Sequence, residues 1–226
     1  STTNDLINNL NKYILKDNKD INLELRNSND DFSMLDIMIG DSLKKVIETL
    51  GEPARKDASR YGFQWYIYNQ DYSKYLQVGV HEGKVVGLYT NSLQWQSETD
   101  VHIGVSKDRI KTIYGEPLEF FKKGNTIYQL DSSEESHTYL VNNYYITFFF
   151  DLHNNSSVTA IQLIDKNIEE NFKGFYGTAS DDLRISFEKQ VFDLANSTRV
   201  RFGLPPFEWN DVAAAAARKH SMDMAR

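Results

Sequence analysis

The sequence of 226 residues contains no cysteine. This absence excludes disulfide bonds, metal sites with thiolate ligands and thiol catalysis, whichever compartment the protein occupies. Long apolar runs are also missing, and no segment approaches the roughly 18 apolar residues that a membrane-spanning helix requires. Lys and Arg are outnumbered by Asp and Glu, and the formal net charge of -7 gives no general attraction to phosphate backbones or anionic lipids. We therefore expect no nucleic-acid partner and no membrane span in this chain.

Small residues mark a pattern that occurs twice. The marker residues are Gly40, Ser42, Gly51 and Pro53 in the first copy and Gly104, Ser106, Gly115 and Pro117 in the second. Each serine lies where a helix N-cap is expected, because its side-chain oxygen accepts an otherwise unpaired backbone N–H. The second glycine of each copy ends the helix in a left-handed conformation, and the proline cannot continue it. Every marker thus has a structural reason to be present, and we interpret the motif as structural rather than ligand-binding.

Strand patterns follow each predicted helix. The expected strands are 63–68, 75–81 and 84–90 in the first copy and 126–130, 139–150 and 158–164 in the second. Aromatic residues make up 13% of the chain, which favours sheets because flat, stiff side chains pack well on a pleated surface. Each copy would lay its helix over one face of an antiparallel sheet, which predicts the α+β class.

The repeated Ile-Gly-x-Ser, apolar helix and Gly-Glu-Pro pattern resembles the CAP-associated N-terminal domain of Gram-positive secreted proteins. It is also similar to the helix-and-sheet repeats of β-lactamase inhibitor proteins and small outer-membrane assembly lipoproteins, which bind other proteins. On this resemblance we expect a tandem-repeat domain over residues 32–165, with repeats at 35–98 and 99–165. Residues 1–31 are rich in Asn, Asp and Lys and are expected to form a tether or a helix.

A second domain is predicted after residues 166–184, which mix charges and glycines without an apolar period and are interpreted as a linker. From Ile185 a helical face is expected, ending near Gly203. Its apolar positions are Phe187, Val191, Leu194 and Ala195. Asn210 or Asp211 then caps a second helix that continues to the end of the chain.

Three segments of this region resemble the opening of a bacterial CAP domain, the SCP-like fold of the cysteine-rich secretory protein superfamily. They are 192–199 with its Asn-x-x-Arg, 203–209 with its Gly-Leu-Pro-Pro-Phe-Glu-Trp, and 217–225 with its His-Ser-x-Asp-Met-Ala. The resemblance covers only the start of such a domain. We therefore expect residues 185–226 to be two helices of an incomplete α/β/α CAP domain.

The CAP resemblance implies that His220 is one of two histidines that, with two glutamates, line a cavity that sometimes holds a metal. The other three positions would lie beyond Arg226, and a zinc site takes at least three protein ligands. We therefore expect no metal, no cofactor and no catalytic residue in this chain. A buried core histidine is the alternative interpretation of His220. Four other histidines lack metal-type spacing and are expected to be solvated: His81, His102, His137 and His153.

Three functions from different classes remain open at this point. The first is a non-catalytic extracellular or cell-surface binding or scaffold module of a Gram-positive bacterium, contacting a protein partner or its own CAP domain. Its possible binding surface is the aromatic set Trp65, Tyr66, Tyr68, Tyr72 and Tyr75, of which we expect about half to fill the sheet core. The second is a metal-assisted hydrolase acting through a CAP cavity with His220, and the third is a lipid or small-ligand carrier.

The apolar side chains of these two helices would lack the core of the complete domain. We expect Phe187, Val191, Leu194 and Trp209 to dock on the repeat domain, to pair with a second chain in a dimer, or to be poorly ordered.

Overall fold

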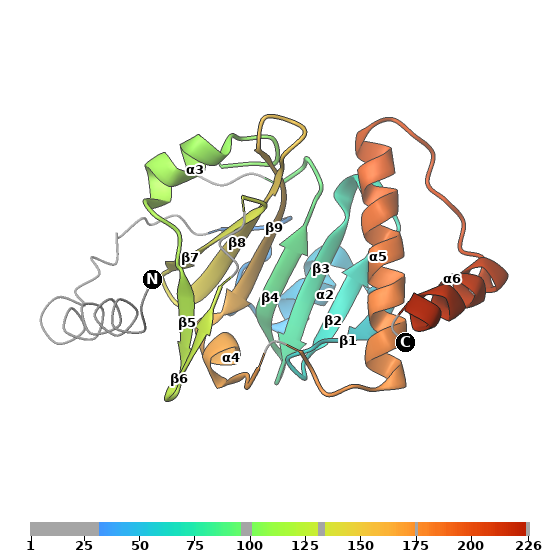
Figure 1. Cartoon of the computed structure of the whole chain (residues 1–226), viewed down its shortest axis with the longest axis horizontal. Coiled ribbons are helices and arrows are strands. Elements are labelled where there is room, and N and C mark those ends of the chain that lie inside the picture. The colour runs from blue at the N-terminus through green and yellow to red at the C-terminus, as the bar shows by residue number, and fades with distance from the viewer. Residues whose placement is uncertain (1–31, 96–100, 131–133, 175, 225–226) are drawn as a thin grey trace, which may run out of the picture.

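The computed structural model describes residues 32–95, 101–130, 134–174 and 176–224. They form a seven-stranded antiparallel sheet with helices on both faces, and a separate two-stranded hairpin (Figure 1). The helices are α2 (Leu43–Leu50), α3 (Lys107–Tyr114), α4 (Lys166–Asn171), α5 (Asp181–Arg201) and α6 (Asp211–Met224), with a 3-10 helix η1 (Tyr72–Lys74). The α+β prediction is confirmed.

The strands of the large sheet lie in the order β1-β2-β3-β4-β9-β8-β7, and β5 pairs with β6 in the hairpin. Their bounds are β1 (Arg55–Ala58), β2 (Gln64–Tyr68), β3 (Leu76–His81), β4 (Lys84–Thr90), β5 (Phe120–Lys123), β6 (Thr126–Gln129), β7 (Ser136–Val141), β8 (Tyr144–Asp151) and β9 (Ser157–Asp165). The two halves of the sheet join where β4 pairs with β9, so both halves share one continuous core.

Helices α2 and α3 have the same end structures. The Ser42 and Ser106 hydroxyls each accept a hydrogen bond from the backbone N–H three residues on, at 3.1 and 3.2 Å. Gly51 and Gly115 close the helices with φ of 78° and 81°. Both values lie in the left-handed region that glycine adopts without steric cost, and the helix ends therefore match the sequence motif.

Both helices are also joined to the sheet in the same way. The Gly40 N–H donates to the Val85 carbonyl at 2.8 Å, and the Gly104 N–H donates to the Val158 carbonyl at 2.7 Å. Each helix entrance is thereby tied to one strand of its own half, β4 or β9. The backbone thus repeats its local geometry in the two halves.

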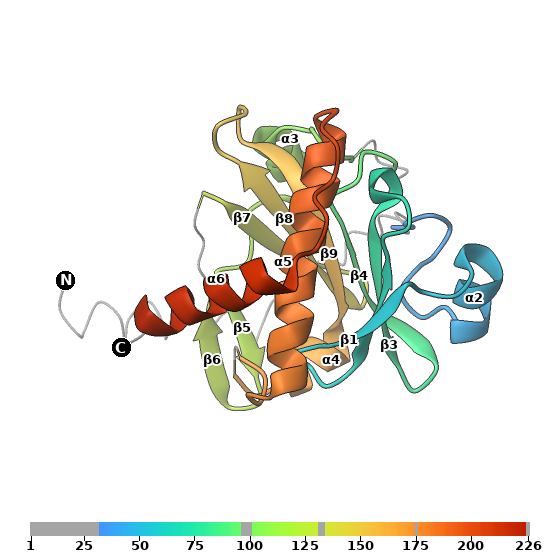
Figure 2. The ribbon, with the colours of Figure 1, turned by 90° about the vertical axis from the view of Figure 1, so that its right-hand side faces the viewer.

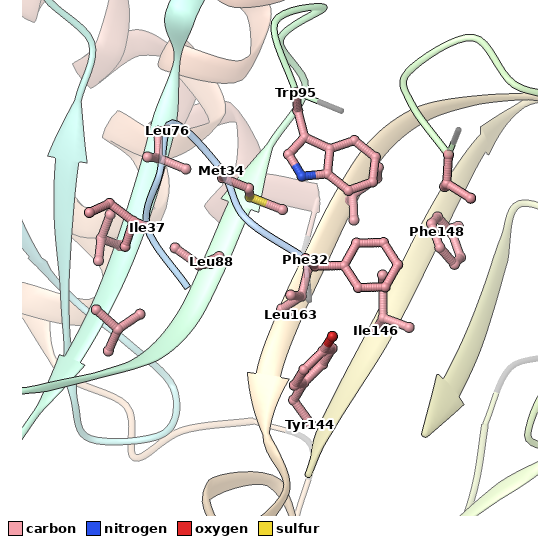
Figure 3. Packing of buried hydrophobic residues seen from close by; sticks show 14 of the residues in the cluster. Phe32, Met34, Ile37, Leu76, Leu88, Trp95, Tyr144, Ile146, Phe148 and Leu163 are labelled. Carbon is pink, nitrogen blue, oxygen red and sulfur yellow. The ribbon is translucent and has the colours of Figure 1, made fainter. Parts of the chain in front are cut away.

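The main core lies between the sheet and helices α2 and α3. Val46 of α2 and Ile110 of α3 are fully buried against it. Phe32 stacks on Trp95 with ring centroids 5.6 Å apart, which ties the segments on either side of the first half together (Figure 3). The sheet contributes alternate residues of its strands, including Leu76, Val78, Leu88, Ile146, Phe148, Ile161 and Leu163. This period of two leaves the intervening side chains on the opposite face.

The opposite face of the sheet carries flat aromatic side chains over two strand glycines. A Cβ atom at Gly79 would lie 2.6 Å from the Phe63 ring, and one at Gly87 would lie 2.8 Å from the Trp65 ring. Neither glycine has a positive φ. They are therefore needed for the space that the rings occupy, and Trp65 packs directly against Gly87 of β4.

Replacing Gly87 with alanine is expected to lower the free energy of unfolding by about 1–3 kcal/mol, because the added methyl group overpacks a rigid indole. Urea denaturation monitored by circular dichroism measures the change. Gln64→Ala, at an exposed position of the neighbouring strand β2, is the matched control and should stay within about 0.5 kcal/mol of the parent. Equal effects of the two substitutions would contradict the steric role of Gly87.

Two predictions about the second half of the sheet are corrected. Residues 139–150, expected as one strand, contain the β7–β8 hairpin, and Asn142 at its turn has a φ of 52°. Residues 166–184, expected as a linker, begin with helix α4, whose N-cap Asp165 accepts hydrogen bonds from two backbone N–H groups. Strands β1 and β5 were not predicted. Residues 1–31, expected as a tether or helix, lie outside the described residues.

His137 is buried, which corrects the prediction that it is solvated. Its ring lies edge-on to Phe150 with centroids 5.0 Å apart. Burial lowers the pKa of His137, and the charges of Lys107 and Lys111 lower it further against a smaller opposing effect of Glu116. The neutral imidazole is therefore the form that the folded state favours.

The protein is expected to lose stability as the pH falls through about 6.5, the ordinary histidine pKa, because the unfolded chain then takes up a proton that folded His137 resists. Denaturation midpoints between pH 5 and 8 measure this slope, and His137→Leu should flatten it. His153→Leu, in an exposed turn, is the control and should leave the slope as it is. The same slope in His137→Leu as in the parent would refute the assignment.

Candidate functional site

Helix α5 crosses the sheet face opposite α2 and α3 with a polar contact surface (Figure 1). Its buried residues are Leu183, Ser186, Asp193, Asn196 and Ser197. Two of the apolar positions expected to pack are exposed instead, Phe187 at 44% and Val191 at 66%. The helix docks on the repeat domain, but Phe187 and Val191 are not covered by this docking, and pairing with a second chain stays a prediction for them.

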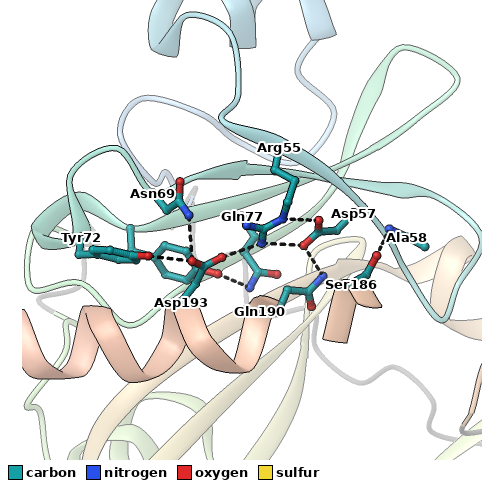
Figure 4. Close-up of polar contacts among 10 residues, drawn as sticks. Arg55, Asp57, Ala58, Asn69, Tyr72, Gln77, Ser186, Gln190 and Asp193 are labelled. Carbon is teal, nitrogen blue, oxygen red and sulfur yellow. Dashed lines mark hydrogen bonds and ion pairs between the residues drawn. The ribbon is translucent and has the colours of Figure 1, made fainter. Parts of the chain in front are cut away.

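Asp193 is the centre of the contact between α5 and the sheet (Figure 4). It is 1% exposed. One carboxylate oxygen accepts a hydrogen bond from the Arg55 guanidinium at 2.7 Å, and the other accepts from the Asn69 amide at 2.8 Å and the Tyr72 hydroxyl at 2.9 Å. A buried carboxylate is costly unless paired and hydrogen-bonded. These partners meet that requirement.

A second carboxylate, Asp57, extends the network along β1. It accepts from Arg55 Nε at 2.6 Å and from Gln190 of α5 at 3.1 Å. Burial alone lowers the pKa of Arg55, but the hydrogen bonds to Asp57 and Asp193 outweigh this and raise it above its ordinary value. The Ser186 hydroxyl accepts from the Ala58 backbone N–H at 2.8 Å. Helix α5 is thus fixed to β1, to Asn69 directly after β2 and to η1 by charged and polar groups.

The Asn-x-x-Arg residues of α5 shape the segment that follows it. The Asn196 amide both donates to and accepts from the Phe207 backbone, at 3.0 and 2.7 Å. Arg199 Nε donates to the Pro205 carbonyl at 2.8 Å. Helix α6 then crosses α5 (Figure 2), and Arg218 forms a bidentate ion pair with Glu188 at 2.8 and 2.7 Å. The connection and both helices form one unit.

The predicted aromatic binding surface is not a surface. Trp65, Tyr66, Tyr68 and Tyr75 are buried, and Tyr72 is half-buried against Asp193. Trp65 and Tyr75 pack under α5, whereas Tyr66 and Tyr68 belong to the main core. The prediction that about half would fill the core was too low. His220, the predicted cavity residue, is exposed on α6.

A groove of about 480 Å³ lies between α5, α4 and the β5–β6 hairpin, over the sheet strands β4, β9 and β8. Glu169 of its lining accepts through Oε1 from Lys123 Nζ at 2.6 Å, and both side chains are buried. The Tyr61 hydroxyl donates to the other Glu169 oxygen. The Lys123 ammonium is surrounded by the rings of Phe121, Tyr128 and Phe172. The described residues hold no group of three or more side chains suited to a metal ion.

The sequence model of the family described as CAP-associated N-terminal matches residues 39–175. The chain belongs to the CAP-associated N-terminal family. The match passes residue 165, the predicted end of this domain, and includes helix α4. The CAP-associated N-terminal domain of this chain therefore keeps the Lys123–Glu169 pair within its own bounds.

Among curated proteins, the uncharacterized membrane protein YlbC of Bacillus subtilis is 31% identical over 205 residues, covering 82% of this chain. This chain spans 59% of the length of YlbC. A solved structure of an extracellular SCP-domain protein from Bacillus anthracis superposes with a TM-score of 0.68 at 26% identity, covering 83% of this chain and 66% of that one. A cysteine-rich secretory protein of Staphylococcus aureus, 16% identical, has the same TM-score over 83% of this chain and 68% of its own.

This chain has a CAP-associated N-terminal domain and is related to CAP and SCP proteins. No helix in the described ranges is both long and apolar enough to span a bilayer.

Proposed function

We propose that this chain is a non-catalytic platform that holds the opening helices of a CAP domain in a fixed position outside the cell. The observation that carries the proposal is the buried polar network around Asp193. Hydrogen bonds and ion pairs require alignment of both partners, so a network of them defines the position of a helix more narrowly than an apolar contact does. In this proposal the protein partner of the repeat domain is its own CAP segment.

The exposed side of α5, α6 and their connection carries many large apolar side chains among its polar ones. They are Ile185, Phe187, Val191, Phe202, Leu204, Phe207, Val212, Met222 and Met224. Large exposed apolar patches mark surfaces that other protein segments cover. Because the chain spans 59% of YlbC, we assign this side to the remainder of a CAP domain, with a second chain as the competing occupant.

The relatives support a location outside the cell or at its surface. One similar protein is described as extracellular and another as a membrane protein. Their sources are Bacillus species, which are Gram-positive. A secreted or surface-attached protein of a Gram-positive bacterium fits both descriptions.

The rigid attachment of α5 is testable by distance measurement between two spin labels. The chain has no native cysteine, so Gln64→Cys on β2 and Val191→Cys on α5, both exposed, give two labelled sites only. Double electron–electron resonance should show one narrow distance distribution. Adding Asp193→Leu should broaden it, and the control Asp182→Leu on the exposed side of α5 should not. A broad distribution without Asp193→Leu would rule out a fixed platform.

The absence of catalysis is tested separately. Purified protein with added zinc should not hydrolyse peptide or cell-wall substrates. Hydrolysis that disappears in His220→Ala and persists in Asp182→Leu would instead support the metal-assisted hydrolase, with His220 in its site.

A further inference from the structure

The groove over the second half of the sheet combines two kinds of side chain. Its aromatic lining consists of Tyr61, Trp65, Tyr89, Phe121, Tyr145, Phe149, Phe172 and Phe187. Its uncharged polar lining consists of Gln77, Ser136, Thr138, Thr147, Gln162 and Gln190. The aliphatic lining is smaller and consists of Pro117, Leu118, Leu130, Ile164 and Leu194. This composition differs from that of a closed aliphatic pocket for an acyl chain.

Two polar groups on the groove floor have no hydrogen-bond partner in the ranges that the structure describes. The Gln162 amide in the middle of β9 and the Tyr89 hydroxyl on β4 make no side-chain hydrogen bond there. Each can both donate and accept. Tyr89 and Gln162 are paired in register on the neighbouring strands β4 and β9. They are therefore neighbouring polar residues on the groove floor.

The side chains that line the groove carry little net charge. Its charged lining residues are Arg60 and Glu169. Glu169 is neutralised by Lys123 at 2.6 Å. The Arg60 guanidinium donates to the Tyr61 hydroxyl at 2.7 Å and lies 4.8 Å from the centre of that ring. Arg201, which interacts electrostatically with Tyr89, donates its hydrogen bonds to Thr159. An anionic ligand would therefore meet cations that already have partners, in a chain whose net charge is -7.

The aromatic rings are held in place before any ligand arrives. Trp65 lies against Gly87, and Tyr61 is stacked on Phe63 with centroids 5.5 Å apart. Tyr145 meets Phe121 edge-on at 4.7 Å. Side chains that packing already fixes lose little conformational entropy when a ligand binds. A weakly binding polar ligand therefore does not have to offset the cost of ordering the site.

We propose that this groove binds a neutral oligosaccharide of two or three sugar rings. A pyranose ring presents C–H groups to the electron-rich face of an aromatic ring, and its hydroxyl groups both donate and accept, as amide and hydroxyl side chains do. Gln162 and Tyr89 hydrogen-bond the sugar hydroxyls, and the half-buried Phe149 ring contacts an apolar face of the sugar. Trp65, which is 5% exposed, lines the groove and reports on its occupation. A volume of about 480 Å³ lies in the range of small-ligand sites. The site is separate from the Asp193 network and goes beyond the platform function.

The test is a titration of the whole chain with three neutral trisaccharides: maltotriose, cellotriose and tri-N-acetylchitotriose. Indole N–H resonances of the tryptophans are followed by NMR. At least one trisaccharide should shift the Trp65 signal saturably, with a Kd below about 5 mM. The Trp95 signal, from the core on the other face of the sheet, should stay in place. No Trp65 shift with any of the three sugars, or a shift produced by palmitate alone, overturns the proposal.

Two groove variants locate the binding. Gln162→Leu keeps the size of the side chain and removes its donor and acceptor, so it should weaken the best trisaccharide about tenfold. Thr147→Val serves as a second groove variant with the same expected direction. Gln129→Leu, at an exposed position of β6 outside the groove lining, should leave the Kd unchanged. Unchanged binding in both folded groove variants would place the sugar elsewhere and refute the site.

Discussion

Replacing Asp193 with alanine is expected to lower the free energy of unfolding by about 3–5 kcal/mol, the usual loss when one partner of a buried ion pair is removed. The substitution leaves the Arg55 guanidinium beside Asp57 alone and removes the acceptor of Asn69 and Tyr72. Urea denaturation of the whole chain measures the loss. Hydrogen exchange should show its largest increase in α5, because the network holds that helix.

Two further variants separate charge from packing. Asp193→Asn keeps the shape and one acceptor oxygen, so we expect a smaller loss than for alanine, of about 1.5–3 kcal/mol. Asp182→Ala lies on the exposed side of α5 and should change stability by no more than about 0.5 kcal/mol. If Asp193→Ala behaved like Asp182→Ala, the polar network would not be what holds α5.

Local signals in the sequence were sufficient for the first helix of each half. Ser42 and Gly51 have roles set by backbone geometry within one helix, and Ser106 and Gly115 repeat them. Strand β4 was predicted with its observed bounds because a run rich in β-branched and aromatic residues lies between turn residues. Features of this kind depend on a few neighbouring residues, and a single sequence contains all of them.

Hairpins and short charged strands were harder to predict. The aromatic run of 139–150 concealed a turn at Asn142-Asn143, although asparagine tolerates the left-handed conformation that tight hairpin turns require. Strand β1 has the sequence Arg-Lys-Asp-Ala, which carries no apolar period. Its place in the sheet follows from pairing with β2 and from α5 above it, and neither is visible locally.

The candidate sites depend on contacts between distant segments. Asp193 meets Arg55 and Asn69 from the other end of the chain, so its burial could not be read from the polarity of α5. The exposed Phe187 and Val191 show the converse. A helical period of apolar residues predicts which side chains form a contact face, but it does not predict which segment packs against that face. The groove likewise needs α4, α5 and the hairpin to be placed over the sheet before its lining is defined.

The Lys123–Glu169 pair supports the last prediction. Lys123→Met is expected to cost about 3–5 kcal/mol of unfolding free energy, because Glu169 then stays buried with the Tyr61 hydroxyl as its remaining hydrogen-bond partner among the described residues. Chemical denaturation measures the loss. Lys173→Met, at an exposed position after α4, is the matched control and should change stability by no more than about 0.5 kcal/mol.

The double variant Lys123→Met/Glu169→Leu decides what the pair contributes. Removing both charges together relieves the desolvation cost of each, so the double variant should lose less stability than Lys123→Met alone. The difference from additivity gives the coupling energy between the two side chains. Additive losses would mean that the ion pair does not fasten the β5–β6 hairpin to α4, and the groove wall would then be held by the rings of Phe121, Tyr128 and Phe172 instead.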